Sequence, residues 1–400
     1  MHRLTKKDRL LKTNVIFGPN ASGKSNILRA VKAIEFLIHQ SSEFKPGDEI
    51  GPYEPHALDT RTVEEPVSLG IEFFASNKIK YEFQFTFCSK KIRNESLFYY
   101  PKGQKTLLFK REEKKPIKFG ESYRGGKKII EKQLLENQLF FSKAALNNAE
   151  SVLIPYKFFM ESVSIYPFLE TYTDSRLSRL YAKRIAEEKN SSFAKKFNML
   201  ICALDTHIQK IASEEVDWTQ YEFPDNIPKD VKTSIKEKYK YDIKSFHKVF
   251  KDEKEVKIIP FDIEDESVGT QSLLVIGGLI IDALENGSVL VVDEFEKNLH
   301  PEITQYLIEL FHNPITNPHN AQLLFATHDI TQLNSDIFRR DQVWFTEKDE
   351  FGVTSLYRCS DFKGLKLNTS LAKWYKSGRF GATPIISDLT FLLEMQQDAK

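Results

Sequence analysis

The sequence predicts an α/β fold: a mixed central sheet plus an antiparallel β meander, with an inserted helical lobe. Three observations support this fold class. A short apolar strand at residues 14–17 leads into a glycine-rich turn and then an amphipathic helix over residues 25–39. Alternating β-type segments follow between residues 66 and 100, which favours a meander. Strand–helix alternation returns after residue 257, which indicates that the α/β unit resumes there.

The individual elements follow from local patterns. The meander strands are expected at Val67–Phe74, Lys80–Phe87 and Ile92–Tyr99, separated by polar turns. Residues 131–255 are predicted as one inserted, mainly helical lobe, with amphipathic stretches at 177–187 and 193–211 and a lysine-rich segment at 229–257. Residues 1–130 and 256–400 then form one split head. Its second part holds strands at 258–261, Val289–Val292 and 322–326, and helices at 273–284 and after Pro301.

Composition bounds the class of protein. Apolar residues make up 41% of the chain and charged residues 28%, as in ordinary globular proteins. The formal net charge of +1 gives no bulk attraction to nucleic acid or membrane, so such a partner needs a local patch. Three scattered cysteines suit neither a disulfide framework nor a four-ligand zinc site, which favours the cytoplasm. No apolar run reaches the length of a membrane span, and residues 273–281 are expected to form a buried helix.

The turn after the first strand matches the phosphate-loop pattern at every defined position. It reads Gly18-Pro-Asn-Ala-Ser-Gly23-Lys24-Ser25 and lies between a predicted strand and a predicted helix. The glycines permit a tight loop whose backbone N–H groups face a phosphate, and the helix adds the positive end of its dipole. Lys24 is expected to bridge the outer phosphates and Ser25 to hold Mg²⁺. The alternative, a glycine-rich turn that only begins a helix, explains fewer of these positions.

Two carboxylates follow the apolar strand Val289–Val292. Because ligands bind at the carboxyl edge of such sheets, we expect Asp293 to bind Mg²⁺ or its waters. Glu294 is expected to orient the attacking water or accept its proton. An Asp-Glu pair is a weak signal alone, since acids often cap helices after strands. Its combination with a phosphate loop is what indicates nucleotide hydrolysis.

Two further elements are expected near the phosphates. His328 follows the next apolar strand and so reaches the same sheet edge, where it could contact the γ-phosphate, with Thr327 assisting by hydrogen bonding. The small-residue turn 266–271 begins an apolar helix, where a serine hydroxyl and free N–H groups form an anion-binding device. Both also have structural readings, as an ordinary histidine after a strand and as an N-cap.

With these elements in this order, the chain resembles the ABC/SMC ATPase superfamily, which includes SMC proteins, RecF and the overcoming-lysogenization-defect nucleases. The resemblance implies a P-loop NTPase head of the ABC type that uses ATP and Mg²⁺. It implies a head-to-head dimer, in which the phosphate loop and acidic strand of one copy face the signature turn of the other. The contacts to the nucleotide would come from Gly18, Asn20, Ala21, Ser22, Gly23, Lys24, Ser25 and Asn26 of one copy and Ser267, Gly269 and Thr270 of the other.

A closer likeness is to the RloA-like stand-alone ATPases of bacterial anti-phage and abortive-infection loci, which occur beside a RloB-like or other nuclease-type partner. It rests on the phosphate loop, Leu58-Asp59 with Glu65-Pro66, Leu139-Phe-Phe-Ser142, Glu266-Ser-Val-Gly-Thr270, Asp293-Glu294 with Leu299-His300-Pro301, and the tail segments 339–348 and 375–382. The sequence departs from relatives in having only seventeen residues before Gly18, Val268 in the signature turn, and Gln138 as the candidate for the Mg²⁺-sensing glutamine. In place of the Ser-Ala-Leu-Asp of many transporters it has Lys297-Asn-Leu-His300.

Two functions of different classes are compatible with these features. The first is a switch in which ATP closes the heads, hydrolysis opens them, and a separate effector protein responds. The chain ends about seventy residues after His328 without a second carboxylate cluster, so we expect the effector on another protein. The second is a RecF-like DNA-binding repair ATPase that uses the lysines of residues 229–257, although acidic residues are interspersed there. Nothing in the sequence indicates a membrane partner.

Overall fold

The central sheet of the computed structural model has six strands in the order β16-β15-β3-β14-β13-β9, all parallel except β16 at one edge. The strands are β3 (Thr13–Phe17), β9 (Val163–Tyr166), β13 (Val289–Val292), β14 (Gln322–Thr327), β15 (Val343–Lys348) and β16 (Thr354–Arg358). Because β3, β14 and β13 are parallel neighbours, their carboxyl ends meet at one edge. The structure describes residues 2–3, 8–166, 176–188, 191–204, 207–366 and 369–384.

Helices cover both faces of this sheet. Leu28 of α1 (Lys24–Gln40) packs with Ile16, Val291 and Ala326 on one face. The other face packs against α8 (Val268–Asn286) and α9 (Pro301–His312) in the largest hydrophobic cluster. By length and composition α8 could cross a membrane, but 67% of its apolar window is buried inside the protein, which suits a core helix. The expectation of a buried helix at residues 273–281 is therefore confirmed.

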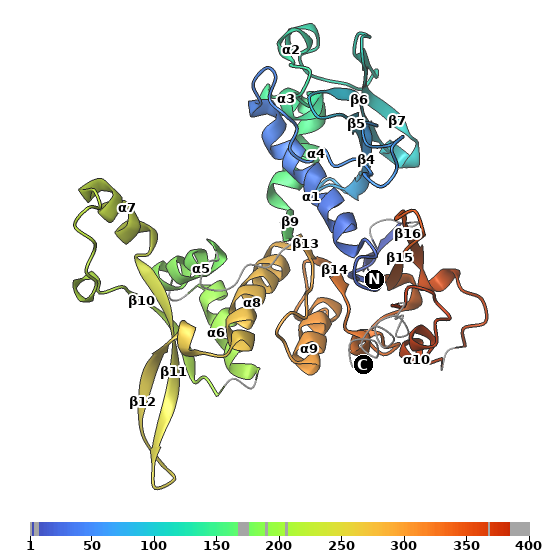
Figure 1. Ribbon diagram of the computed structural model, residues 1–400. Coiled ribbons are helices and arrows are strands. Elements are labelled where there is room, and N and C mark those ends of the chain that lie inside the picture. Colours follow the sequence, from blue (N-terminus) through green and yellow to red (C-terminus); the bar gives the residue numbers. More distant parts are fainter. Residues whose placement is uncertain are drawn as a thin grey trace, which may run out of the picture.

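The meander is a second sheet with the order β4-β5-β6-β7-β8, antiparallel throughout. Its strands are β4 (Val67–Phe74), β5 (Lys80–Phe87), β6 (Ile92–Tyr99), β7 (Thr106–Glu112) and β8 (Lys118–Phe119). Figure 1 shows α1 leading from the central sheet toward this second sheet. Ile34, Leu37 and Ile38 in the second half of α1 are buried in the meander's own hydrophobic cluster. One helix therefore links the two cores.

Residues 131–255 differ from the predicted mainly helical lobe. The first helices, α2 (Lys128–Gln133), α3 (Phe140–Leu146) and α4 (Glu150–Glu161), contribute to the meander cluster, and β9 joins the central sheet. The helix expected over 193–211 ends at Ala203, and β10 begins at Lys210. The lysine-rich segment forms only one helix, α7, and then a hairpin. Its high charge obscured a period-2 alternation in which Ile243 and Ser245 are buried.

The rest of the lobe consists of α5 (Arg176–Glu187), α6 (Ser192–Ala203), β10 (Lys210–Glu215), α7 (Lys229–Lys238), β11 (Tyr241–Lys251) and β12 (Lys254–Asp262). Strands β10, β11 and β12 form a third, antiparallel sheet, and the β11–β12 hairpin projects away from the body of the molecule (Figure 1). The remaining elements are β1 (His2–Arg3), β2 (Arg9–Leu10), α10 (Leu371–Lys376) and the 3₁₀ turns η1 (Ser41–Glu43), η2 (Pro101–Gly103), η3 (Trp218–Gln220), η4 (Ile263–Asp265), η5 (Ile330–Gln332), η6 (Arg340–Gln342) and η7 (Cys359–Asp361).

The predicted fold class is confirmed: a mixed central sheet and an antiparallel meander are both present. The three predicted meander strands have the predicted bounds, as does β13. The division into a split head and an insert at residues 131 and 255 remains a prediction.

Candidate functional site

The predicted phosphate loop joins β3 to α1. Gly23 has a φ of 102° and Ala21 a φ of 62°, so two positions of the loop adopt left-handed backbone. That conformation favours glycine at position 23 and turns the chain sharply into α1. The Lys24 ammonium donates to the carbonyl oxygens of Gly18 at 2.7 Å and Pro19 at 3.1 Å. The lysine therefore lies across the mouth of its own loop, where a phosphate would compete for its protons.

The loop is braced by the two tail strands β15 and β16. The Ser22 and Thr346 hydroxyls are 2.6 Å apart, and the Thr354 hydroxyl donates to the Ser22 carbonyl at 3.0 Å. There is no room for larger residues at the glycines. A Cβ on Gly18 would lie 2.3 Å from the Thr346 hydroxyl oxygen, and one on Gly23 would lie 2.2 Å from that of Thr354. Both glycines thus serve close packing as well as loop geometry, and no local sequence signal predicted these two threonines.

The acidic strand end follows β13. Asp293 is only 5% exposed, its carboxylate accepts from the Glu294 amide at 3.1 Å, and its own amide donates to the Tyr166 carbonyl. Glu294 has a φ of 49°, which is strained for a residue with a side chain, and its side chain is 54% exposed. Such strain concentrates at functional positions. Asp293 is therefore held in the sheet edge, whereas Glu294 extends outward from it.

Lys24 lies in the field of the acidic loop. Burial lowers the pKa of the Lys24 ammonium, while the negative charges of Asp293, Glu296 and Glu294 act in the opposite direction. Lys24 and residues 293–296 therefore lie at the same edge of the sheet, because β3 and β13 both pair in parallel with β14. The sequence analysis expected Lys24, Asp293 and Glu294 at this edge.

Glu296 is a site residue that the sequence analysis did not identify. It is 8% exposed, and its Oε1 accepts from the His328 backbone amide at 3.0 Å and lies 3.2 Å from His328 Nδ1. Its other oxygen, Oε2, is buried without a hydrogen-bond partner among the described residues. The carboxylate thus orients His328, whose side chain is 59% exposed. The only sequence signal was a third acid two residues after Glu294.

The turn after β14 fixes His328 from the other side. Thr327 is buried, and its hydroxyl accepts from the Asp329 amide at 3.0 Å. The threonine therefore shapes the turn that holds the histidine at the sheet edge. The remaining predicted nucleotide contacts in the loop are accessible: Asn20, Ala21 and Asn26 are exposed, and Ser25 is half-buried.

The predicted signature turn lies at the start of α8. The Ser267 hydroxyl accepts from the Thr270 amide at 3.1 Å and lies 2.9 Å from the Thr270 hydroxyl, so Ser267 is the N-cap. A Cβ on Gly269 would lie 2.8 Å from the Asn298 carbonyl oxygen, and Asn298 also donates to Ser272. The turn therefore packs on the loop that follows β13. At its start, the Glu266 carboxylate also accepts from the Ser245 hydroxyl of β11.

Two weaker candidates have structural roles. The Gln138 amide donates to the carbonyls of Ser42 and Phe44, beyond the far end of α1. The 17 residues of α1 rise by about 25 Å, so Gln138 lies far from the phosphate loop and its suggested Mg²⁺-sensing role is wrong. His300 is the N-cap of α9, and its Nδ1 accepts from the Glu302 amide at 3.3 Å.

The donor set fits a nucleotide-held magnesium ion. No cluster of three His, Cys, Asp or Glu side chains suitable for a metal occurs among the described residues. Mg²⁺ in phosphoryl-transfer sites usually has one or two protein ligands, and phosphates and waters supply the rest. Asp293 is buried at the sheet edge and has no ion-pair partner in the described part of the chain. Ser25, in the first turn of α1, is the second candidate ligand.

Comparison with known proteins gives one family. The model of the family described as "AAA domain, putative AbiEii toxin, Type IV TA system" matches residues 13–334. Among solved structures, the chain is similar to an SMC head bound to the C-terminal winged-helix domain of ScpA, with 13% sequence identity and a TM-score of 0.44. That likeness covers 92% of this chain and 93% of the other. No curated protein matches the sequence.

Proposed function

Because this chain belongs to the family of AAA domains whose model spans residues 13–334, we propose that it binds and hydrolyses ATP as a dimerising switch for a separate effector protein. One observation carries the hydrolytic part of this proposal. Strands β3 and β13 both pair in parallel with β14, so the phosphate loop after β3 and the acidic segment after β13 lie at the same sheet edge, although Lys24 and Asp293 are nearly 270 residues apart in sequence. A phosphate loop beside a carboxylate cluster is the arrangement that metal-assisted phosphoryl transfer requires.

Each residue has a distinct part in the proposed mechanism. The loop amides and Lys24 hold the phosphates, and Lys24 exchanges its bonds to the Gly18 and Pro19 carbonyls for phosphate oxygens. Ser25 and Asp293 hold Mg²⁺, which would neutralise charge on the phosphates when bound. Glu294, extended at the sheet edge, orients water and accepts its proton.

His328 and Glu296 act together on the far side of the phosphates. His328 contacts the γ-phosphate, and Glu296 holds the imidazole in position through Nδ1. We assign Glu296 a positioning role, because its Oε1 accepts from the His328 amide and lies 3.2 Å from His328 Nδ1.

The dimeric part of the proposal is supported by the outward position of the signature turn. Ser267 is exposed and Val268 is 58% exposed, while Gly269 is half-buried and Thr270 is buried beside them at the start of α8. We propose that these residues contact the phosphates held by a second copy. A two-fold dimer would then contain two composite sites.

Mixing two inactive variants tests this arrangement. Lys24→Ala and Ser267→Arg should each abolish turnover, but in a mixed dimer one site has both substitutions and the other has neither. Random pairing should therefore restore about a quarter of wild-type phosphate release. A double variant mixed with itself is the control. Absence of rescue, together with absence of ATP-dependent dimers in a Glu294→Gln background, would contradict shared sites.

A separate effector in an anti-phage defence locus is the second part of the proposal. The family description, which names a type IV TA system, supports such a setting. Purification of Glu294→Gln with its genomic neighbours should retain the effector on the ATP-closed form and lose it from Lys24→Ala. Equal recovery on both variants would contradict nucleotide control of the partner.

The alternative, a RecF-like DNA-binding repair ATPase, is favoured by one feature. Helix α7 and the adjoining hairpin carry many exposed lysines, and Lys232, Lys236 and Lys238 form no ion pair within the described residues. Binding of duplex DNA that weakens steeply with salt would favour this alternative.

A further inference from the structure

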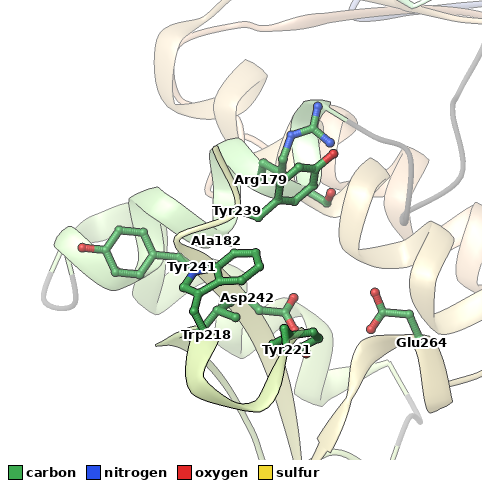
Figure 2. Close-up of a pocket in the computed structure, with 10 residues that line it drawn as sticks. Arg179, Ala182, Trp218, Tyr221, Tyr239, Tyr241, Asp242 and Glu264 are labelled. Carbon is green, nitrogen blue, oxygen red and sulfur yellow. The ribbon is translucent and has the colours of Figure 1, made fainter. Parts of the chain in front are cut away.

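The lobe contains a pocket whose lining residues have no part in the proposed ATPase mechanism. Its volume is about 230 Å³, and it lies between α5, η3, the start of β11 and η4. Figure 2 shows Glu264 facing Trp218, Asp242 and Tyr239 across the pocket, with Arg179 beside Tyr239. Ligand pockets commonly measure ~300–1,000 Å³, so this one suits a small planar group.

The pocket offers a flat aromatic surface beside positive charge. Trp218 is stacked on Phe223 with ring centroids 5.7 Å apart, and its indole nitrogen is buried with no hydrogen-bond partner among the described residues. Lys232 and Lys236 lie within 6 Å of the Phe223 ring, at 5.9 and 5.8 Å, and Arg179 lies 5.2 Å from the Tyr239 ring. Helix α7 carries four lysines against two acids. Aromatic rings interleaved with unpaired cations are the usual surface for stacked bases and their phosphates.

The pocket also contains hydrogen-bond acceptors. Asp242 is partly neutralised by Lys244 at 3.3 Å. Glu264 forms no ion pair within the described ranges. Burial raises the pKa of its carboxyl, and Asp242 and Asp262 act in the same direction, while a hydrogen bond from its own backbone N–H and the charge of Lys244 act against them. The Glu264 carboxylate is exposed at the rim of the pocket and has no ion-pair partner among the described residues, so it can accept N–H donors from a ligand. The amino edges of cytosine, adenine and guanine supply such donors, whereas thymine presents carbonyl oxygens on both sides of its single N–H.

We propose that this pocket binds one nucleotide unit with an amino-bearing base. The base stacks on Trp218, its amino group donates to Glu264, and its phosphate lies toward Arg179 and the α7 lysines. The unit could belong to a free mononucleotide or to single-stranded nucleic acid, which share this chemistry. Binding here does not depend on the ATPase function proposed above.

Only two residues, Asp265 and Glu266, separate Glu264 of the pocket from Ser267 of the signature turn. The Glu264 and Glu266 carbonyls both accept from the Gln271 amide in the first turn of α8, at 3.4 and 3.0 Å. Ser267 follows directly. A ligand that draws Glu264 into the pocket therefore acts on the start of α8, and this coupling rests on the proposed function.

Binding is tested with full-length protein in the absence of ATP. Dye-labelled single-stranded (dC)₆ and (dT)₆ are titrated by fluorescence anisotropy, and unlabelled 5′-CMP is the competitor. We expect (dC)₆ to bind more tightly than (dT)₆. Trp218→Ala should weaken (dC)₆ binding at least fivefold, the lower limit for one lost base stack, while Trp218→Phe should retain most of the affinity. Glu264→Gln should remove the preference for cytosine.

The controls separate the outcomes. Tyr306→Ala, at an exposed aromatic residue on α9, should leave (dC)₆ binding unchanged. Lys24→Ala should also bind (dC)₆ with wild-type affinity, because the proposed pocket does not include the phosphate loop. Competition by millimolar 5′-CMP identifies a free nucleotide as sufficient, and its absence with intact (dC)₆ binding identifies nucleic acid. Wild-type affinity in folded Trp218→Ala, or no binding of either probe at 1 mM, overturns the proposal. Turnover measured with the bound probe tests the coupling separately, and an unchanged rate overturns it alone.

Discussion

The phosphate loop and the signature turn are held in different ways. The phosphate loop is fixed at its centre by two threonines of the tail strands, which bond to Ser22 from more than 320 residues away. Its helix α1 is buried in two separate hydrophobic clusters. The loop's position is therefore determined by the whole head and needs no second molecule to form.

The signature turn is instead held by hydrogen bonds to β11 of the lobe. Glu266, the residue before Ser267, accepts a hydrogen bond from Ser245 and lies 2.6 Å from His247, both on β11. Strand β11 continues into the projecting hairpin (Figure 1). A movement of β11 would therefore shift Glu266 and the signature turn directly. The phosphate loop is bonded to β15 and β16 instead. The comparison predicts that a change in the lobe affects the signature turn more than it affects the phosphate loop.

The largest expected effect is a loss of ATP hydrolysis without a loss of ATP binding at the phosphate loop. Glu294→Gln should lower phosphate release by about 10²–10⁴-fold, because the amide cannot accept a proton from water. ATP affinity, measured by calorimetry, should stay near wild type, because the loop and Lys24 are untouched. Glu350→Gln, at an exposed turn, is the matched control. Hydrolysis at the wild-type rate would remove Glu294 from its assigned role.

The next effect concerns Glu95 of β6, in the meander core that holds the second half of α1. The fully buried Glu95 carboxylate accepts from the Phe140 and Phe141 amides at 2.7 Å, and Ser142 in the same helix donates to the Ile38 carbonyl of α1. Burial outweighs the nearby Arg111 and these amides and raises the pKa of Glu95 to about 7 from 4.5. The folded protein therefore binds a proton more tightly than the unfolded chain does.

This shift has a definite sign. The stabilisation is complete below about pH 4.5 and is lost as the pH rises to about 7, at a total of about 3 kcal/mol. Relative to Glu95→Gln, wild type should lose that much unfolding free energy between pH 4.5 and 7.5 in urea titrations. Glu121→Gln, at an exposed carboxylate in the turn after β8, should not alter the pH profile. Parallel profiles for wild type and Glu95→Gln would contradict a raised pKa.

Sequence patterns located the parts of the site that are encoded locally. The strand, loop and helix around Gly18 to Lys24, and the apolar run before Asp293, are each recognisable within about ten residues. They also share a sheet edge, which follows from parallel strand order. The order of these motifs indicated the family resemblance, and the resemblance added the expectation of a site shared between two copies.

The missed residues depend on tertiary contacts. Thr346 and Thr354 bond to Ser22 across 324 and 332 residues, and no local pattern encodes that pairing. Glu296 becomes a partner of His328 only because β13 and β14 are neighbours. The β11–β12 hairpin was obscured because lysines occupy its exposed positions and weaken the apolar alternation.

A smaller effect tests the hydrogen bond between Thr346 and Ser22 of the phosphate loop. Thr346→Val keeps the shape of the side chain but removes its hydrogen bond to Ser22, which leaves the loop less ordered. The loss of one hydrogen bond, about 1 kcal/mol, should weaken ATP binding about fivefold. Thr219→Val in the lobe, where the hydroxyl bonds to Asp217, should leave ATP affinity unchanged. If both variants had the same effect, the phosphate loop would not be held by the tail strands.

The smallest effect tests the tether of the signature turn. Glu266→Gln retains an acceptor for Ser245 but loses the charge that attracts His247, which should loosen the turn slightly. ATP-dependent dimerisation, measured by sedimentation in a Glu294→Gln background, should weaken about threefold, as expected for a change near 0.6 kcal/mol. ATP binding by the monomer should not change, because the phosphate loop is braced independently. Glu255→Gln removes a comparable charge from the hairpin tip, where Glu255 pairs with Lys248, and should leave dimerisation intact. If Glu266→Gln instead weakened monomeric ATP binding, the two halves of the site would not be held separately, and the lobe would act on both.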